Sequence, residues 1–460
     1  MKLTADFHIH SRFSRATSKE LTLESLYRAC RLKGVDVVGT GDFTHPEWFS
    51  EIKAKLVEAE PGLFELKREW MQAAETELPC LCRGRVRFIL VSEISNIYKK
   101  DGRTRKSHNL VFMPDIESAR RFNARLGSIG NISSDGRPIL GLDARDLLEI
   151  VLETSPDAFL IPAHIWTPWF SVLGSKSGFD SIGECFGDLT RHVFAVETGL
   201  SSDPAMNWRV SSLDGLCLVS NSDAHSAGNV GREANLFEAD LSYTSLRDAL
   251  KTKDPLRFKG TIEFFPEQGK YHLDGHRGCK VCLEPKETRR SAGNCPACGK
   301  PVTVGVLSRV EELADRPEGW RPDTAPPFLS LVPLTDILAE LFQAGPKSTK
   351  VAHAYRTALE RLGPELPILV DLEPEHIATS QIPLLPEAIR RVREKRLHIR
   401  PGFDGEYGAI EIFSAGEHAL LRGQKTLFAA AGPRQTAEKR SPSVLEERPL
   451  MPLSWMNIKM

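Results

Sequence analysis

The sequence predicts an α/β fold over about the first 255 residues, then a cysteine-containing segment and a mainly helical C-terminal part. Three observations predict this order. Short apolar runs alternate with amphipathic stretches up to about residue 255, four cysteines form two close pairs, and apolar residues recur at helical spacing after residue 309. Alternating strand-like and helix-like segments are typical of parallel β/α units. The 460 residues are 41% hydrophobic and 26% charged, which excludes an intrinsically disordered chain.

The predicted strands are short apolar runs, and two amphipathic segments between them have the helical period. The strand candidates are residues 35–38, 86–91, 109–112, 158–162, 193–196 and 216–219. The helix candidates are residues 21–32 and 143–152. We divide the chain into a barrel at 1–255, a zinc-binding domain at 256–308, a mainly helical domain at 309–415 and a flexible tail at 416–460.

Charge is balanced over the whole chain but not along it. Sixty basic and 61 acidic residues leave a net charge of −1, so no global charge favours a polyanionic partner. Residues 251–310 carry 12 Lys and Arg against 6 Asp and Glu, and such an excess can bind phosphates without reading sequence. A solvated basic face is the alternative. No apolar run approaches the ~20 residues of a membrane span, so we expect a cytoplasmic protein with no membrane partner.

Four of the nine cysteines have the spacing of a zinc ribbon. They are Cys279, Cys282, Cys295 and Cys298, two pairs with two residues inside each pair. This spacing lets one turn present two sulfurs to one ion, and four thiolates suit a structural Zn²⁺. An odd number of cysteines argues against a disulfide framework, and a redox pair does not explain two such pairs. We therefore predict a structural zinc site with four cysteine ligands.

Metal-binding side chains follow most of the predicted strands. They are His8, His10, Asp42, His45, Glu93, His108, His164, Asp223 and His225. In β/α barrels the reactive groups lie at the carboxyl ends of the strands, and two imidazoles separated by one strand residue point the same way. Each residue alone could be a helix cap or an ordinary buried side chain. Their recurrence favours a metal centre in which Glu93 bridges two ions and Asp6 orients a ligand imidazole.

Ordered motifs in this part carry a family resemblance. They are His8-Ile9-His10-Ser11, Gly41-Asp42-Phe43-Thr44-His45, Glu93, His108, Pro162-Ala163-His164 and Ser222-Asp223-Ala224-His225. They resemble the polymerase-and-histidinol-phosphatase (PHP) domain, which implies a distorted (β/α)7 barrel with a two- or three-metal phosphoesterase centre.

The PHP resemblance also implies how the ligands are divided, with Asp223, Glu93 and His164 as the catalytic residues. One metal would be held by His8, His10, Glu93 and Asp223, and a second by Glu93, His108 and His164. A third would use His225 with Asp42 or His45. Residues 11–17 lack the histidine or acidic ligand that many PHP domains have there.

Longer strings extend the resemblance over roughly residues 1–415. They include residues 39–48, 164–170, 174–179, 197–209 and 309–314. Together they resemble the endonuclease Q family of DNA repair enzymes. The resemblance implies damaged DNA as the partner, and therefore a nucleoid-associated protein. It also implies cleavage 5′ of uracil, hypoxanthine, xanthine and abasic sites, and two or three catalytic Zn²⁺, Mn²⁺ or Mg²⁺ ions.

Candidate DNA contacts follow the ligand His164, because reading a base requires a pocket with stacking and hydrogen-bonding groups. They are Trp166, Trp169, Phe170, Ser171, Ser175, Lys176 and Ser177, with Trp208 and Arg209 as a second set. Barrel packing is the alternative for the aromatic residues. In the tail, Gln424, Leu427 and Phe428 resemble the peptide that binds the bacterial sliding clamp, although a chance match also explains so short a pattern.

Two other functions use some of the same features. A small-molecule phosphatase of the histidinol-phosphate type would share the metal centre, but it gives no reason for a zinc ribbon and a basic segment. A non-catalytic clamp- or DNA-binding module with a decayed PHP fold would not need the clustered imidazoles and carboxylates.

Overall fold

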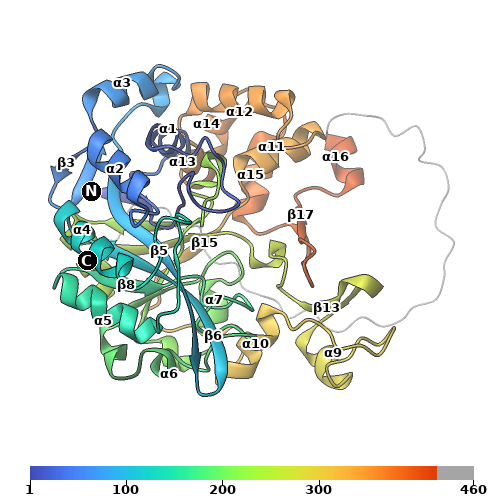
Figure 1. Cartoon of the computed structure of the whole chain (residues 1–460). Coiled ribbons are helices and arrows are strands. Elements are labelled where there is room, and N and C mark those ends of the chain that lie inside the picture. The colour runs from blue at the N-terminus through green and yellow to red at the C-terminus, as the bar shows by residue number, and fades with distance from the viewer. Residues whose placement is uncertain (422–460) are drawn as a thin grey trace.

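The computed structural model describes residues 1–421, and its N-terminal part is built on a mixed sheet of eleven strands (Figure 1). These strands are β1 (Lys2–Asp6), β2 (Val37–Gly39), β3 (Leu56–Glu60), β4 (Leu63–Leu66), β5 (Arg87–Lys100), β6 (Arg103–Met113), β7 (Ile139–Leu140), β8 (Phe159–Pro162), β11 (Ala234–Glu238), β12 (Phe258–Glu263) and β15 (Phe328–Ser330). The main path runs β15-β12-β11-β1-β2-β5-β4-β3, and β6 joins β5 to β8. The β1–β2 and β2–β5 pairs are parallel, whereas β5–β6 and β6–β8 are antiparallel.

A parallel pair of strands closes a ring with this sheet. It consists of β9 (Ala195–Glu197) and β10 (Cys217–Val219). After β8, the backbone N–H of Ile165 donates to the carbonyl of Glu197, and after β10, Ala224 forms a bridge with Ile9. Backbone hydrogen bonds therefore lead from β1 through β2, β5, β6, β8, β9 and β10 back to β1.

Helices cover the outside of this ring. They are α1 (Leu23–Lys33), α2 (Pro46–Lys55), α3 (Arg68–Glu75), α4 (Ile116–Gly127), α5 (Ala144–Thr154), α6 (Ile182–Phe186), α7 (Pro204–Asn207) and α8 (Tyr243–Thr252). The helices expected at 21–32 and 143–152 are confirmed as α1 and α5. Thr22 and Ser25 form a capping box at the start of α1, and Gly34 ends it with φ 86°. Asp143 caps α5 by accepting from the N–H of Arg145.

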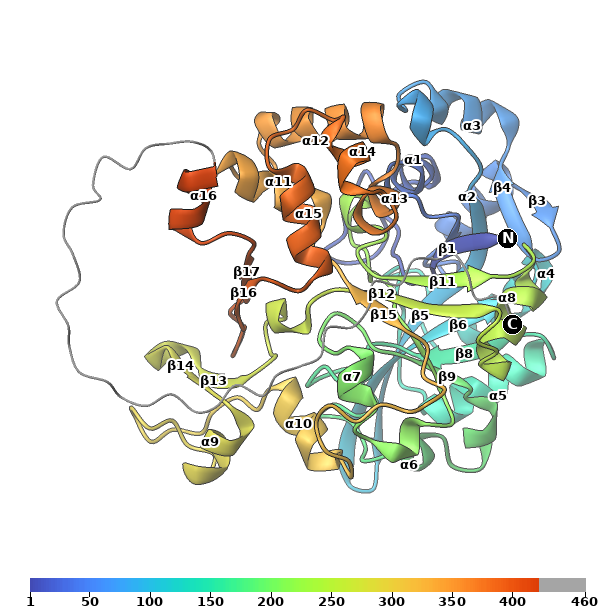
Figure 2. The ribbon, with the colours of Figure 1, turned by 180° about the vertical axis from the view of Figure 1, so that it is seen from behind.

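The C-terminal part is mainly helical, as predicted, and packs against the ring (Figure 2). It contains α10 (Val306–Leu313), α11 (Leu334–Phe342), α12 (Thr349–Leu362), α13 (Glu365–Val370), α14 (Pro374–Ala378), α15 (Leu385–Arg393), the hairpin β16 (His398–Arg400) and β17 (Ala409–Glu411), and α16 (Ala415–Leu421). One apolar cluster joins residues of α1 and α5 to residues of α11, α12 and α15. A buried ion pair of 2.7 Å between Lys33 in α1 and Glu365 in α13 adds to this contact.

The cysteine-containing segment forms a small lobe at one side of the molecule (Figure 1). It consists of the antiparallel hairpin β13 (Asp274–His276) and β14 (Val281–Leu283), followed by α9 (Pro285–Arg290). The buried members of its own apolar cluster are Leu283, Cys295 and Val302, and the partly buried Cys279 and Val281 pack against them. Within residues 1–421, no helix has the length and apolar character needed to cross a membrane.

Candidate metal centre

Six of the predicted ligands form two groups at one end of the ring of strands. The ligand atoms of His8, His10 and Asp223 lie within 4.8 Å of one another, and so do those of Glu93, His108 and His164. In the first group, His10 Nε2 lies 3.0 Å from Asp223 Oδ1. In the second, His108 Nδ1 lies 2.7 Å from Glu93 Oε1 and His164 Nε2 lies 3.2 Å from it.

Glu93 joins the two groups. Its Oε1 faces His108 and His164, whereas its Oε2 lies 3.6 Å from His8 Nε2 and 3.4 Å from His10 Nε2. The side chain is fully buried in strand β5. This is the arrangement expected of a carboxylate that bridges two ions.

The donor set fits divalent metal ions. His8 Nε2 is buried and has no hydrogen-bond partner within residues 1–421, although it points at two carboxylates. A buried polar atom without a partner is costly, and an ion between the groups would remove that cost. Imidazole and carboxylate donors together suit Zn²⁺, Mn²⁺ or Fe²⁺. Asp223 and His225 keep 27% and 29% of their side-chain surface exposed, so the centre is open to solvent on that side.

Buried charges shift the pKa values in this centre strongly. Burial opposes protonation of His8, but Glu197, Asp223 and Glu93 outweigh it and hold the His8 pKa well above its ordinary value. The pKa of His10 is raised to about 9 for the same reason, because the interactions with Asp223 and Asp42 outweigh the effect of burial. Burial instead lowers the pKa of His108 to about 4. Metal binding to His8 and His10 would therefore release protons.

Three site residues have left-handed backbone conformations where strands end. Asp42, His164 and Asp223 have φ of 45°, 30° and 46°. Non-glycine residues pay of order 1–3 kcal/mol for such geometry, which persists mainly at functional sites. Gly199 shows how tightly His164 is held, since a Cβ there would lie 2.4 Å from the Cβ of His164.

Carboxylates behind the ligands orient the imidazole rings. Both oxygens of Glu197 lie 3.1 Å from His8 Nδ1, and Asp42 Oδ1 lies 3.2 Å from His10 Nδ1. Glu197 was not predicted from the sequence, although it directly follows a predicted strand. The role expected of Asp6 was wrong, because Asp6 accepts from the backbone N–H groups of Ser222 and Gly231 and so holds the loop after β10.

Arg137 is a second site residue that the sequence did not indicate. Its Nη1 donates to Glu93 Oε2 over 2.9 Å, and the guanidinium keeps 23% of its surface exposed. No strand precedes it directly, so the strand-end pattern gave no signal for it.

The structure does not bring the third predicted set of ligands, His225 with Asp42 or His45, together in one group. The Asp42 carboxylate accepts from Ser11 and Ser14 besides facing His10. His45 Nε2 lies 3.1 Å from the Ser133 carbonyl. His225 Nδ1 lies 3.5 Å from Asp223 Oδ1 and so belongs to the edge of the first group.

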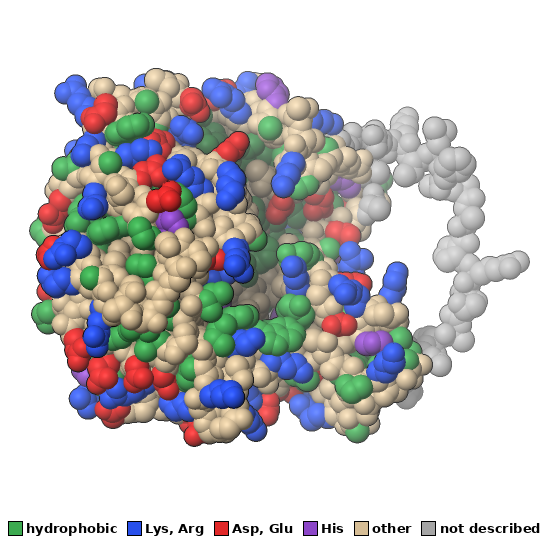
Figure 3. All heavy atoms as spheres, viewed as in Figure 1, with side chains coloured by type: hydrophobic (Ala, Val, Ile, Leu, Met, Phe, Trp, Pro, Cys, Tyr) green, Lys and Arg blue, Asp and Glu red, His purple; other side chains and the backbone are tan. Residues whose placement is uncertain are grey.

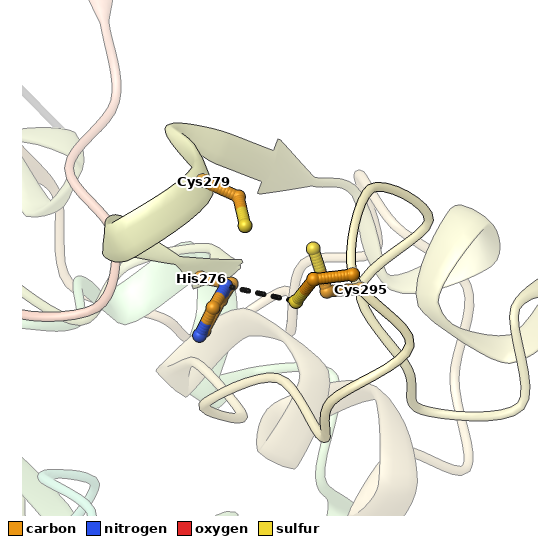
Figure 4. A group of neighbouring side chains, drawn as sticks. His276, Cys279 and Cys295 are labelled. Atoms are coloured by element: carbon orange, nitrogen blue, oxygen red, sulfur yellow. Dashed lines mark hydrogen bonds between the residues drawn. The ribbon is translucent and has the colours of Figure 1, made fainter.

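Three of the four cysteines predicted to bind zinc lie together with a histidine. The ligand atoms of His276, Cys279, Cys295 and Cys298 lie within 4.8 Å of one another (Figure 4). Cys282 is not part of this group.

The chain is similar over most of its length to structures of lesion-specific nucleases. It is 32% identical to the lesion-specific endonuclease PfuEndoQ from Pyrococcus furiosus, with 89% of this chain and 95% of that chain covered and a TM-score of 0.77. The chain belongs to the endonuclease Q family.

Three further comparisons agree with membership of the endonuclease Q family. A structure of endonuclease Q in complex with a 27-mer duplex that has an abasic lesion at the active site is 31% identical, with 90% and 97% coverage and a TM-score of 0.77. The uncharacterized protein YqxK of Bacillus subtilis is 30% identical over 425 residues, 89% of this chain and 99% of YqxK. Residues 333–396, which hold α11 to α15, match the family model of the MJ0043 C-terminal domain.

The predicted DNA contacts of this endonuclease Q family member differ in exposure. Trp166 is fully buried, and its Nε1 donates to Asn207 over 2.7 Å, so it is a packing residue. Trp169 is 40% exposed and touches Tyr271 edge to face at 5.7 Å between centroids. The Phe170 ring lies 4.8 Å from the His108 ring.

The polar residues of the loop after His164 also differ in exposure. Ser171 and Ser177 are buried, and Ser171 Oγ donates to the His164 carbonyl. Ser175 Oγ is buried and has no hydrogen-bond partner in the described part of the chain, whereas Lys176 is exposed.

The second predicted set of DNA contacts, Trp208 and Arg209, lies near the C-terminal part. Trp208 touches Phe328 edge to face at 5.7 Å and lines a cavity of about 410 Å³ with Pro322 and Pro327. Arg209 Nε is buried and has no partner among residues 1–421. Gln424, Leu427 and Phe428 lie outside the described residues.

A deep hollow separates the main body of the molecule from the lobe that carries β13 and α9 (Figure 3). Lys and Arg side chains lie along its rim, together with hydrophobic side chains. The contact between Trp169 and Tyr271 connects the loop after His164 to the chain that enters this lobe. Lys and Arg side chains can bind the phosphates of a DNA backbone.

Proposed function

We propose that this chain is a metal-dependent DNA endonuclease that cleaves the phosphodiester on the 5′ side of deaminated bases and abasic sites in DNA repair. The deaminated bases are uracil, hypoxanthine and xanthine. The observation that carries the proposal is the pair of ligand groups joined by Glu93, in a chain that aligns over nine tenths of its length with lesion-specific endonucleases.

The ring of strands supports a PHP-type barrel in this endonuclease. Seven strands, β1, β2, β5, β6, β8, β9 and β10, follow one another around the ring, and the two ligand groups lie where several of them end. We propose that they form the distorted (β/α)7 barrel of residues 1–255. The zinc-binding domain at 256–308 and the helical domain at 309–415 would then follow it.

The metal ligands of this site divide between two positions. His8, His10 and Asp223 would hold one ion, His108 and His164 a second, and Glu93 both. Zn²⁺, Mn²⁺ or Mg²⁺ ions held there lower the pKa of an attacking water and offset charge on the leaving oxygen. The catalytic residues in this proposal are Asp223, Glu93 and His164, because they would hold these ions.

Several residues of the chain prepare this site for a phosphodiester. Glu197 and Asp42 favour the proton on Nδ1 of His8 and His10, so that Nε2 is left for the centre. Arg137 brings a guanidinium beside Glu93, where it can pair with a phosphate oxygen. The first effect orients the metal ligands, and the second would bind and orient the substrate before the bond breaks.

The loop after His164 supports recognition of a displaced nucleotide. Phe170 lies against the ligand His108, and the exposed Trp169 and Lys176 lie in the same loop. Aromatic rings can stack on bases or replace a missing one, and a lysine can bind a phosphate. The basic residues of 251–310 would add contacts that do not depend on sequence.

A sliding clamp is a second proposed partner, and it rests on the sequence alone. Gln424, Leu427 and Phe428 have the side chains that such a peptide docks in a preformed groove. Binding of the full chain to a bacterial clamp, compared with a Gln424→Ala/Phe428→Ala variant, tests it. Equal binding by both chains would contradict it.

A cleavage assay on a set of end-labelled duplexes tests the proposed activity. The duplexes carry one deoxyuridine, deoxyinosine, deoxyxanthosine or abasic site, or no lesion, and Mg²⁺ or Mn²⁺ is supplied and then chelated. We expect metal-dependent nicking one bond 5′ of each lesion and none in the plain duplex. Intact duplexes together with hydrolysis of a small phosphomonoester would instead show a phosphatase of the histidinol-phosphate type.

A further inference from the structure

The fourth ligand of the zinc site can be derived from the hairpin β13–β14. Cys279, Cys295 and Cys298 lie together with His276, and His276 Nδ1 is 3.6 Å from Cys298 Sγ. In a tetrahedral site with Zn–S of ~2.3 Å and Zn–N of ~2.0 Å, a nitrogen and a sulfur are separated by about 3.5 Å. The observed distance has the value that a shared zinc ion requires.

The register of the hairpin separates Cys282 from this group. Gly275 pairs with Cys282, and His276 pairs with Val281. Paired residues of antiparallel strands point to the same face, and successive residues point to opposite faces. Cys282 therefore points to the face opposite His276.

The two faces of the hairpin have different neighbours. On the face of His276, Val281 and Leu283 pack in the cluster that contains Cys279 and Cys295. On the other face, a Cβ at Gly275 would lie 2.4 Å from the ring of Phe403, so this face is covered by the turn before β17. Cys282 lies on the face covered by this turn, whereas the other three cysteines of the segment lie on the face of His276.

We propose that His276, through Nδ1, completes the structural zinc site with Cys279, Cys295 and Cys298, and that Cys282 is not a ligand. His276 and Cys279 then have the same two-residue spacing as Cys295 and Cys298. Three cysteines with one histidine are an established structural zinc set. Figure 4 shows His276 and Cys279 on the hairpin facing Cys295 on the following loop.

The site has a structural consequence for the nuclease. The hairpin and the loop of Cys295 share few apolar contacts, so the ion supplies much of what joins them. Arg277, next to His276, donates its backbone N–H to Asp404, which also accepts from Thr303. Zinc binding thereby stabilises the contact between the lobe and the turn before β17.

Cobalt substitution tests the ligand set without using nuclease activity. The untagged full chain is loaded with Co²⁺, and the thiolate-to-cobalt charge-transfer absorption is measured per bound ion. The proposed catalytic ligands include no thiolate, so cobalt bound there does not contribute. We expect Cys282→Ser to keep the whole band and Cys279→Ser to lose about one third of it, because three thiolates bind.

Two variants at residue 276 complete the test. His276→Ala is expected to weaken Zn²⁺ binding at least tenfold in competition with a chelator. His276→Cys is expected to increase the charge-transfer band by about one third, because a fourth thiolate joins the site. Loss of about one quarter of the band in Cys282→Ser, with His276→Ala and His276→Cys unchanged, would show the four-cysteine set and overturn the proposal.

Discussion

Nδ1 of His8 lies 3.1 Å from both carboxylate oxygens of Glu197, which also accepts the backbone N–H of His164 over 2.7 Å. One buried carboxylate therefore positions a ligand from each of the two groups. Asn221 donates to Glu197 over 2.8 Å and fixes it in turn. The two halves of the metal centre are thus connected through Glu197 behind the ligands as well as through Glu93 between them.

Replacing Glu197 should weaken the centre without unfolding the protein. Glu197→Gln removes the charge that holds Nδ1 of His8, and we expect a 10–100-fold loss in metal affinity, with cleavage partly restored by excess metal. Metal titrations and cleavage rates check this. The control is Glu263→Gln, since Glu263 is also buried but contacts Thr198 and Ser220 and no predicted ligand. Equal metal affinity in both variants would contradict the role of Glu197.

Gly199 should tolerate no side chain. Gly199→Ala puts a Cβ 2.4 Å from the Cβ of His164, so the imidazole must shift and cleavage should fall at least tenfold. Gly102→Ala is the matched control, because Gly102 also has positive φ (71° against 66°) but has no described atom within 4 Å of the added Cβ. Both variants should lose about 1 kcal/mol of stability from the backbone alone, and only Gly199→Ala should lose activity. Equal activity in the two variants would count against the placement of His164.

The buried carboxyl group of Glu263 should make the free energy of unfolding fall as the pH rises. Burial raises its pKa from 4.5 to about 8. The folded state therefore keeps a proton that the unfolded state loses above about pH 4.5, and this stabilisation disappears as the pH rises through about 8. Between these values the slope is about 1.4 kcal/mol per pH unit. Urea unfolding of Glu263→Gln from pH 5 to 9 should show a flatter dependence than the unchanged chain, and parallel curves would refute this.

Replacing Trp169 should weaken DNA binding, whereas replacing Trp166 should lower the stability of the fold. Trp169 is exposed, so Trp169→Ala should weaken binding to abasic DNA by about 1–3 kcal/mol and leave the unfolding midpoint unchanged. Trp166 is buried, so Trp166→Ala should lose about 3–5 kcal/mol of stability. Trp70 in α3 is exposed to the same extent as Trp169, 39% against 40%, and Trp70→Ala is the control for DNA binding. Unchanged DNA binding by Trp169→Ala would remove this residue from the interface.

The strand ends could be predicted from the sequence because their signal is local. A short apolar run followed by a histidine or carboxylate led to His8, His10, Glu93, His164 and Asp223. His108 directly precedes such a run, and the structure brings all six together in two groups. The helices at α1 and α5 were equally evident from the helical period of their apolar residues.

Other features depend on contacts between distant residues. Glu197 is 189 residues from His8, so nothing near it in the sequence distinguishes it from a helix cap. The spacing of the cysteines does not show that Cys282 points to the other face of its strand. Trp166 and Trp169 stand in one loop, and only the fold decides that the first is buried and the second exposed. Asp42 and His45 also follow a strand, but their side chains contact His10, Ser11 and Ser133 instead of each other.

The most direct measurement compares the unchanged chain with Asp223→Asn on an end-labelled duplex that carries one abasic site, with DNA binding measured in parallel. Asp223 Oδ1 lies 3.0 Å from His10 Nε2 at the exposed edge of the centre, so the change removes a ligand charge and little else. We predict metal-dependent nicking 5′ of the lesion by the unchanged chain, and DNA binding without nicking by the variant. Nicking by Asp223→Asn at the original rate would contradict the proposed metal centre.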